Sequence, residues 1–92
     1  MSYILEFSET ALYDIETHKK VGDKAVLKKI DKLLNELMKH PTTGTGQPEK
    51  LKHDYAGLYS RRINNKHRLI YSIDENIVTV QVLNAWGHYL DK

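Results

Sequence analysis

The sequence reads LYSRRINNKHRLIYSIDENIVTVQVL from residue 58 to residue 83, and this segment predicts three consecutive β-strands. Alternating apolar side chains indicate strands at Leu58–Ile63, His67–Ile73 and Ile77–Leu83. The residues between them, Asn64-Asn65-Lys66 and Glu75-Asn76, are typical of tight turns. Strands joined by such short turns pair antiparallel, so the segment is predicted to form a β-meander.

The lengths of the two turns set the register of the predicted strands. In this register Arg62 lies opposite Arg68, and these two arginines share the open face of the sheet with Gln81. The core-facing side chains are predicted to be those of Tyr59, Arg61, Ile63, Leu69, Tyr71, Ile73, Val78, Val80 and Val82. Leu83 is expected on the open face, and the chain that follows it would pass beside Arg68.

Residues 3–40 predict one short strand followed by two helices. The strand covers Tyr3–Phe7, and Ser8 is a suitable N-cap for a helix that extends to about residue 20. The apolar side of this helix is formed by Ala11, Leu12 and Ile15. Asp23 caps a second helix, whose apolar residues recur at helical spacing from Val26 to Met38. The order of elements predicts an α+β fold, β-α-α-β-β-β, in which both helices pack on one face of a small twisted antiparallel sheet.

Length and composition limit the kinds of protein that this chain can be. Ninety-two residues form one domain, so residues 1–92 are expected to fold as a single unit. Cysteine is absent, which excludes disulfides and thiolate-bound metals. No apolar run approaches the roughly 20 residues of a membrane span, and the N-terminus lacks a signal-peptide pattern. We therefore expect a soluble cytoplasmic protein that does not engage a membrane.

Positive charge is concentrated in the middle of the chain. Residues 45–68 hold six lysines and arginines against two acidic residues, whereas residues 1–44 hold seven of each kind. Residues 69–92 hold one basic residue against three acidic ones. The central segment therefore predicts a surface that binds a polyanion, with Glu49 at its entrance.

Glutamate, arginine and histidine on a basic surface can cleave RNA without a metal ion. A carboxylate can remove the proton of a 2′-hydroxyl, arginine can stabilise charge on the phosphate oxygens, and an imidazolium can protonate the leaving oxygen. The same residues also have structural interpretations: Glu49 as a loop carboxylate or ion-pair partner, Arg61 and Arg62 as edge charges, His88 as a surface histidine. His53 and His67 are equally eligible by residue type. Taken alone, these residues indicate a basic α+β domain that binds an anion.

Three sequence blocks add a resemblance to a known family. They are GTGQPEKLK at residues 44–52, GLYSRRI at residues 57–63 and HRLIY at residues 67–71. Together they resemble the YoeB/Txe branch of the RelE toxin superfamily, and the similarity extends from the first strand through His88-Tyr89. One departure is that Leu90-Asp91-Lys92 follow Tyr89, where the family usually ends.

The resemblance implies a type II toxin that enters the ribosomal A site and cleaves mRNA there, with neither metal nor cofactor. Glu49 matches the position of the general base, Arg68 that of the phosphate-stabilising arginine, and His88 that of the general acid. Tyr89 matches a tyrosine that helps to position the substrate. The RNA-binding residues are expected to be Lys52 and Arg62 from the family pattern, with Lys50 and Arg61 added from the local charge.

The resemblance also implies the partners of the protein. They are a YefM-like antitoxin whose flexible C-terminal segment wraps the toxin, the 70S ribosome with its mRNA, and operator DNA reached only through the antitoxin. A homodimer is a further expectation. Two alternatives stay open: a superfamily member that has lost catalysis and acts as an antitoxin-binding corepressor, and a ParE-like poison of gyrase, which lacks the Glu/Arg/His set.

Overall fold

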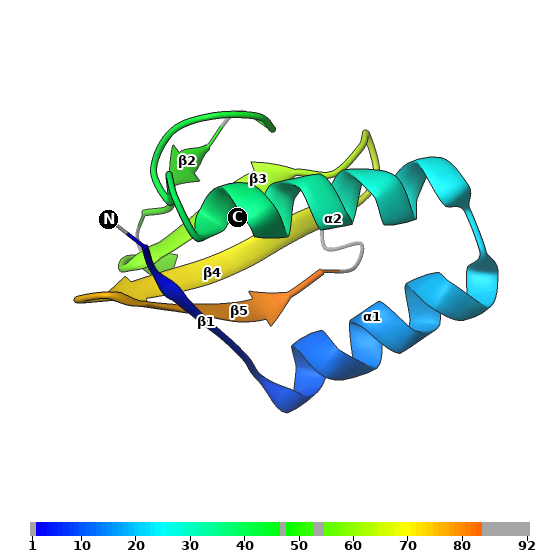
Figure 1. Cartoon of the computed structure of the whole chain (residues 1–92), viewed down its shortest axis with the longest axis horizontal. Coiled ribbons are helices and arrows are strands. Elements are labelled where there is room, and N and C mark those ends of the chain that lie inside the picture. Colours follow the sequence, from blue (N-terminus) through cyan, green and yellow to red (C-terminus); the bar gives the residue numbers. More distant parts are fainter. Residues whose placement is uncertain (1, 47, 53–54, 84–92) are drawn as a thin grey trace.

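A five-stranded sheet and two helices form the fold in the computed structural model, which describes residues 2–46, 48–52 and 55–83 (Figure 1). The elements in chain order are β1 (Ile4–Phe7), α1 (Glu9–Val21), α2 (Lys24–Leu37), β2 (Glu49–Lys50), β3 (Leu58–Arg62), β4 (Arg68–Asp74) and β5 (Ile77–Val82). The strand order across the sheet is β1-β5-β4-β3-β2. In Figure 1, α2 crosses the sheet over β3 and β4, and apolar residues of both helices join one core with the sheet. The predicted α+β fold is confirmed.

The meander has the predicted register over most of its length. Arg62 pairs with Arg68 across β3 and β4, and Asp74 pairs with Ile77 next to the second turn. These pairs confirm both predicted turn lengths. Tyr59 and Tyr71 also pair, and their rings stack 5.7 Å apart on the side of the sheet that the helices cover.

A bulge at the end of β5 reverses the predicted orientation of its last residues. Tyr71 pairs with Val80 but Ile70 pairs with Val82, so Gln81 is an extra residue in β5. An extra residue inverts the in–out alternation beyond it. Val82 therefore packs with Ile70 on the open face, and Leu83 enters the main core with no exposed surface. The prediction of a buried Val82 and an open-face Leu83 was wrong.

The sheet is mixed, whereas an antiparallel sheet was predicted. β1 runs parallel to β5, with Ile4 opposite Ile77 and Phe7 opposite Val80. The connection between β1 and β5 contains both helices and strands β2 to β4, so it is far longer than a parallel pair requires. β2, a strand of two residues that pairs antiparallel with β3, was not predicted either. It is too short to show an alternating pattern in the sequence.

The caps of both helices agree with the sequence. Ser8 Oγ accepts the amide of Ala11 at 3.0 Å, and Asp23 caps α2 in the same way. The buried residues of α2 are Val26, Ile30, Leu33 and Leu37, as the helical spacing predicted. Leu12, predicted to face the core, is 52% exposed. Ala11 is buried and Ile15 packs against the core, as predicted, and Asp14 and His18 complete the buried side of α1. No helix in the described part of the chain is long and apolar enough to cross a membrane.

Candidate functional site

Glu49 and two arginines lie on neighbouring rows of the open sheet face. Glu49 pairs with Ser60, and Ser60 pairs with Ile70 on the next strand. Side chains of directly opposed residues project to the same face. Arg62 and Arg68 form the adjacent row, about 7 Å along the strands from Ser60 and Ile70. The structure therefore brings together three of the predicted site residues.

The paired arginines form a concentrated positive charge. Burial lowers the pKa of Arg68, the charge of Arg62 lowers it further, and the carboxylate of Glu49 acts in the opposite direction. The carboxylate of Glu49 therefore interacts electrostatically with Arg68. Arg62 Nε and Ser60 Oγ are shielded from solvent and have no hydrogen-bond partner among the described residues. Two half-buried guanidiniums directly opposite each other suit an anion that both can bind.

A groove borders the carboxylate side of this site. It is lined by Ser8, Thr10, Leu51, Tyr55, Leu58, Ile70, Gln81 and Val82, with a volume of about 450 Å³. Ile70 belongs both to the groove and to the row that carries Glu49. Its apolar side chains form a second small core on the open face, and Ser8, Thr10 and Gln81 add polar groups. Such a groove suits a flat, partly apolar group next to the arginines.

The other predicted site residues differ in where they lie. Lys50 is exposed, but it pairs with Tyr59 and so starts on the opposite face from Glu49. Lys52 is exposed just after β2. His53, His88 and Tyr89 lie outside the described residues, so their predicted roles stay predictions.

Arg61 does not belong to the predicted RNA-binding surface. Its side chain is 0% exposed, and its guanidinium donates to Glu36 Oε1 at 2.9 Å and to the carbonyl of Thr43 at 2.6 Å. It also donates to the carbonyl of His40 and to the hydroxyl of Tyr71. A guanidinium enclosed in this way does not reach a polyanion, so Arg61 has a structural role here. The strand alternation had placed Arg61 on the core side, and that signal was the correct one.

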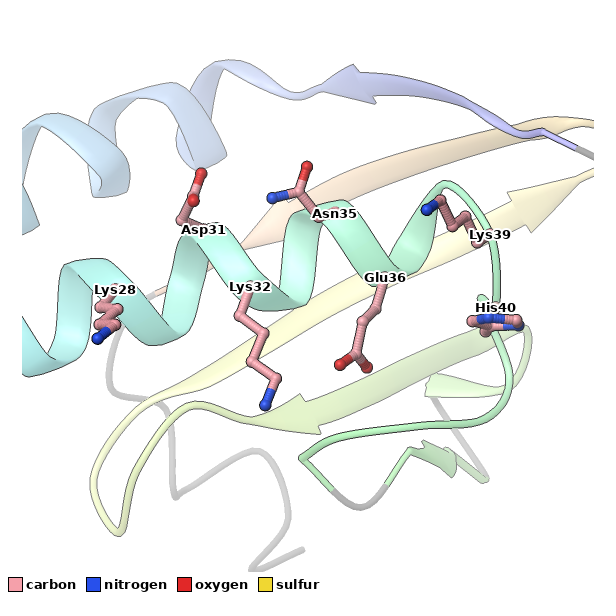
Figure 2. Close-up of a pocket in the computed structure, with 7 residues that line it drawn as sticks. All are labelled: Lys28, Asp31, Lys32, Asn35, Glu36, Lys39 and His40. Carbon is pink, nitrogen blue, oxygen red and sulfur yellow. The ribbon is translucent and has the colours of Figure 1, made fainter.

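Glu36 is the partner that the sequence reasoning missed. Figure 2 shows its carboxylate extending from α2 toward β3, away from the helix axis. Thr45 donates its hydroxyl to Glu36 Oε2 at 2.7 Å and its amide to Oε1 at 2.8 Å. The hydroxyl hydrogen bond from Thr45, the amide of Thr45 and the charge of Arg61 hold the pKa of Glu36 below its ordinary value, against an opposing effect of burial.

His67, eligible by residue type as a catalytic histidine, belongs to another cluster. It precedes Arg68, so its side chain starts on the opposite face of the sheet, and its ring meets that of His18 edge-on at 4.8 Å. Burial lowers the pKa of His67, and the charges of His18 and Lys66 lower it further. These effects disfavour the imidazolium that a general acid requires. His18 Nε2 donates to the carbonyl of Leu83 at 2.5 Å, and Asp14 accepts the amide of Leu83 at 3.0 Å.

Comparison with known proteins identifies the class of molecule that carries this site. Residues 7–89 match the family described as YoeB-like toxin of bacterial type II toxin-antitoxin system. Toxin YoeB of Escherichia coli strain K12 is 40% identical over 58 residues, which are 63% of this chain and 69% of that protein. The fold matches the structure of the YoeB dimer from Staphylococcus aureus with a TM-score of 0.81 and 36% identity, over 94% of this chain and 99% of the other. A heterotetrameric YoeB–YefM complex from the same organism matches over the same shares, with a TM-score of 0.80 and 36% identity.

The fold and the paired-arginine site thus define a small toxin of the RelE-like superfamily. Within that class, this chain belongs to the YoeB-like toxins of bacterial type II toxin–antitoxin systems. The family resemblance predicted from the three sequence blocks is confirmed.

Proposed function

We propose that this protein is a ribosome-dependent endoribonuclease that cleaves mRNA in the ribosomal A site and so inhibits translation. The observation that carries the proposal is the arrangement of Glu49 one row from the Arg62–Arg68 pair on an open sheet face. A base beside two cations is what an attack of a 2′-hydroxyl on its own phosphate requires. The absence of cysteine is compatible with a cytoplasmic site of action, where the ribosomes are.

The reaction begins with the exposed carboxylate of Glu49, which takes the proton of the 2′-hydroxyl. The 2′-oxygen attacks the adjacent phosphorus, and a 2′,3′-cyclic phosphate forms as the bond to the 5′-oxygen breaks. That oxygen takes up a proton, which the family resemblance assigns to His88, with Tyr89 positioning the substrate. Each proton-transfer group contributes about 10²–10⁴-fold to the rate.

Arg62 and Arg68 stabilise the charge that develops on the phosphorane oxygens. Burial lowers the pKa of Arg68 and the charge of Arg62 lowers it further, and this mutual repulsion is relieved when an anion binds between the two arginines. Because this repulsion is relieved most by the most negative species, the pair favours the transition state over the ground state. Lys52, exposed beyond β2, is suited to a flanking phosphate, and the groove beside Ile70 is suited to a base that has left its stack.

The proposed partners follow from relatives that have been solved as complexes. YoeB of Staphylococcus aureus occurs as a dimer and as a heterotetramer with YefM. We therefore propose that this toxin is inhibited by a YefM-like antitoxin, reaches operator DNA only through it, and forms homodimers.

The function is tested by mapping RNA ends on programmed ribosomes. Purified toxin added to ribosomes with a defined codon in the A site should produce a cut within that codon, with a 2′,3′-cyclic phosphate upstream and a 5′-hydroxyl downstream. Prior addition of the antitoxin should prevent the cut. Intact mRNA together with tight antitoxin binding would instead support the alternative of a catalytically inactive corepressor.

A further inference from the structure

The loop from His40 to Gly46, which leads into β2, is fixed by one buried network. Arg61 from β3 donates to the carbonyls of His40, Thr43 and Thr45, and to Glu36 of α2. Tyr71 of β4 donates its hydroxyl to the carbonyl of Pro41 at 2.5 Å, and that hydroxyl also accepts from Arg61 Nε at 3.3 Å. Three secondary-structure elements therefore hold the loop through side chains. We call Glu36, Arg61 and Tyr71 the loop clamp.

The loop fits the clamp closely enough to require glycine at Gly44. A Cβ at this position would lie 2.5 Å from Glu36 Oε1 and 3.3 Å from Arg61 Nη1. Its φ of 117° also lies in the region that favours glycine. The backbone at Gly44 therefore passes directly over the Glu36–Arg61 ion pair.

The clamp connects to Glu49 through the two adjacent arginines of β3. Arg61 turns its side chain toward the loop, while the amide of Arg62 donates to the carbonyl of Gly46 at 2.6 Å. The side chain of Arg62 projects to the open face, opposite Arg68. One dipeptide thus holds the end of the loop and supplies a cation to the site. Glu49 follows three residues after Gly46, in a strand of only two residues.

Such a short edge strand has few interactions of its own to fix its position. Besides its two ladder pairs with β3, the amide of Leu51 donates to the carbonyl of Leu58 at 2.9 Å. Glu49 and Lys50 are both exposed, so they add little apolar burial. Glu49 is therefore held from two sides, by the preceding loop and by Leu51 after the strand, which is buried against Ile70.

We propose that Glu36, Arg61 and Tyr71 are positioning residues, which aim the Glu49 carboxylate at the 2′-hydroxyl by fixing the loop that precedes it. This inference rests on the proposed function and deepens it. A buried ion pair contributes little net stability, because desolvation offsets the attraction between its charges. The guanidinium of Arg61 instead fixes the conformation of the loop, because its planar set of N–H donors binds several carbonyls at once.

The first test is Tyr71→Phe, which keeps the core ring and removes only the hydroxyl between Pro41 and Arg61. Under single-turnover conditions, the cleavage rate at saturating toxin should fall about 10- to 100-fold, the usual effect of misplacing a reactive group by about 1 Å. The toxin concentration for half-maximal rate should not change, because the RNA contacts remain. Tyr13→Phe, which removes a hydroxyl from a side chain that is 72% exposed on α1, is the control and should cleave normally.

A double-mutant cycle separates positioning from general destabilisation. In the Glu49→Gln background, Tyr71→Phe should cause no further loss of residual cleavage, because no carboxylate is left to aim. The inference would be overturned if the losses in cleavage rate caused by Glu49→Gln and Tyr71→Phe multiplied in the double variant. An unchanged cleavage rate for Tyr71→Phe alone would also overturn it. Thr45→Val removes the hydroxyl that donates to Glu36, at the half-buried end of the network. This variant should behave in the same way as Tyr71→Phe, and it replaces Tyr71→Phe if that variant folds poorly.

Amide hydrogen exchange tests the clamp independently of catalysis. The amides of Leu51 and Arg62 should exchange at least about tenfold faster in Tyr71→Phe, while the amide of Ser8, bonded to Val80 across the sheet, should not change. Equal changes at all three amides, or no change, would overturn the inference. A wild-type protein that leaves ribosome-bound mRNA intact would overturn the proposed function, and the exchange rates would still decide whether the clamp holds β2.

Discussion

Arg62 and Arg68 lie directly opposite each other on β3 and β4, on the face of the sheet that the helices leave open. Like charges in directly opposed positions destabilise a sheet, and the charge of Arg62 adds to burial in lowering the pKa of Arg68. In the proposed mechanism, the pair is an anion site that is already formed before the RNA binds. The same pair of charges thus serves the proposed function and lowers the stability of the folded protein.

This conflict predicts that Arg62→Gln makes the protein more stable and less active. The free energy of unfolding should rise by about 0.5 kcal/mol, within the range for opposed cross-strand charges. Cleavage should fall at least about tenfold, because one cation at the phosphate is lost. Urea unfolding and single-turnover cleavage measure the two effects. Lys52→Gln, an exposed charge after β2, is the control for stability and should leave the midpoint unchanged. A lower free energy of unfolding for Arg62→Gln would show that the arginine pair does not destabilise the sheet.

Asp14 on α1 should contribute strongly to stability through the backbone of Leu83. Asp14→Ala leaves the buried Leu83 amide without its acceptor and should cost about 1–3 kcal/mol of unfolding free energy. Glu16→Ala is the matched control on the same helix, since the Glu16–Lys19 pair is exposed and should be worth less than about 0.5 kcal/mol. Equal effects of the two variants in chemical denaturation would contradict the assignment.

Gly44 and Gly57 should differ in their tolerance of alanine. Both have positive φ, at 117° and 93°, so alanine strains each backbone by about 1–2 kcal/mol. A Cβ at Gly44 also meets the Glu36 carboxylate, whereas one at Gly57 meets nothing within 4 Å. Gly44→Ala should therefore lower the melting temperature by clearly more than Gly57→Ala. Indistinguishable melting temperatures would show that the loop does not rest on the ion pair.

His67 should make the folded state sensitive to mild acid. Its pKa in the folded protein lies below the ordinary 6.5, so the unfolded chain binds the proton more readily. Its contribution to stability is therefore fully present above about pH 6.5 and is lost as the pH falls toward the folded pKa. His67→Gln removes this titration and should flatten the dependence of the unfolding midpoint on pH between 7 and 5. An unchanged slope in that window would assign the acid sensitivity to another group.

Local sequence patterns predicted much of this fold because they act over short distances. Turn residues fixed the β3–β4 register, and helical spacing identified the buried face of α2. The bulge at Gln81 escaped prediction, since a single inserted residue in a strand of alternating valines leaves no local mark. The parallel pairing of β1 with β5 joins residues more than seventy positions apart, and it depends on how both helices pack.

The candidate site was predicted in part. Strand alternation was enough to bring Arg62 and Arg68 together, the charge distribution singled out Glu49, and the family blocks added its role as general base. Charge counting misled at Arg61, because it treats every guanidinium as surface charge. The Glu36 partner lies on a helix 25 residues earlier, and no local pattern relates it to β3. The assignments of His88 and Tyr89 rest on the family resemblance.

The most direct test of the account is the rate at which Glu49→Gln cleaves mRNA in the A site of programmed ribosomes. Glutamine keeps the size of the side chain and its place opposite Ser60, but it cannot accept the proton of the 2′-hydroxyl. Single-turnover cleavage should fall about 10²–10⁴-fold, with the free energy of unfolding and the concentration for half-maximal rate unchanged. Cleavage by Glu49→Gln at the wild-type rate would contradict the assignment of Glu49 as the base, and with it the proposed mechanism.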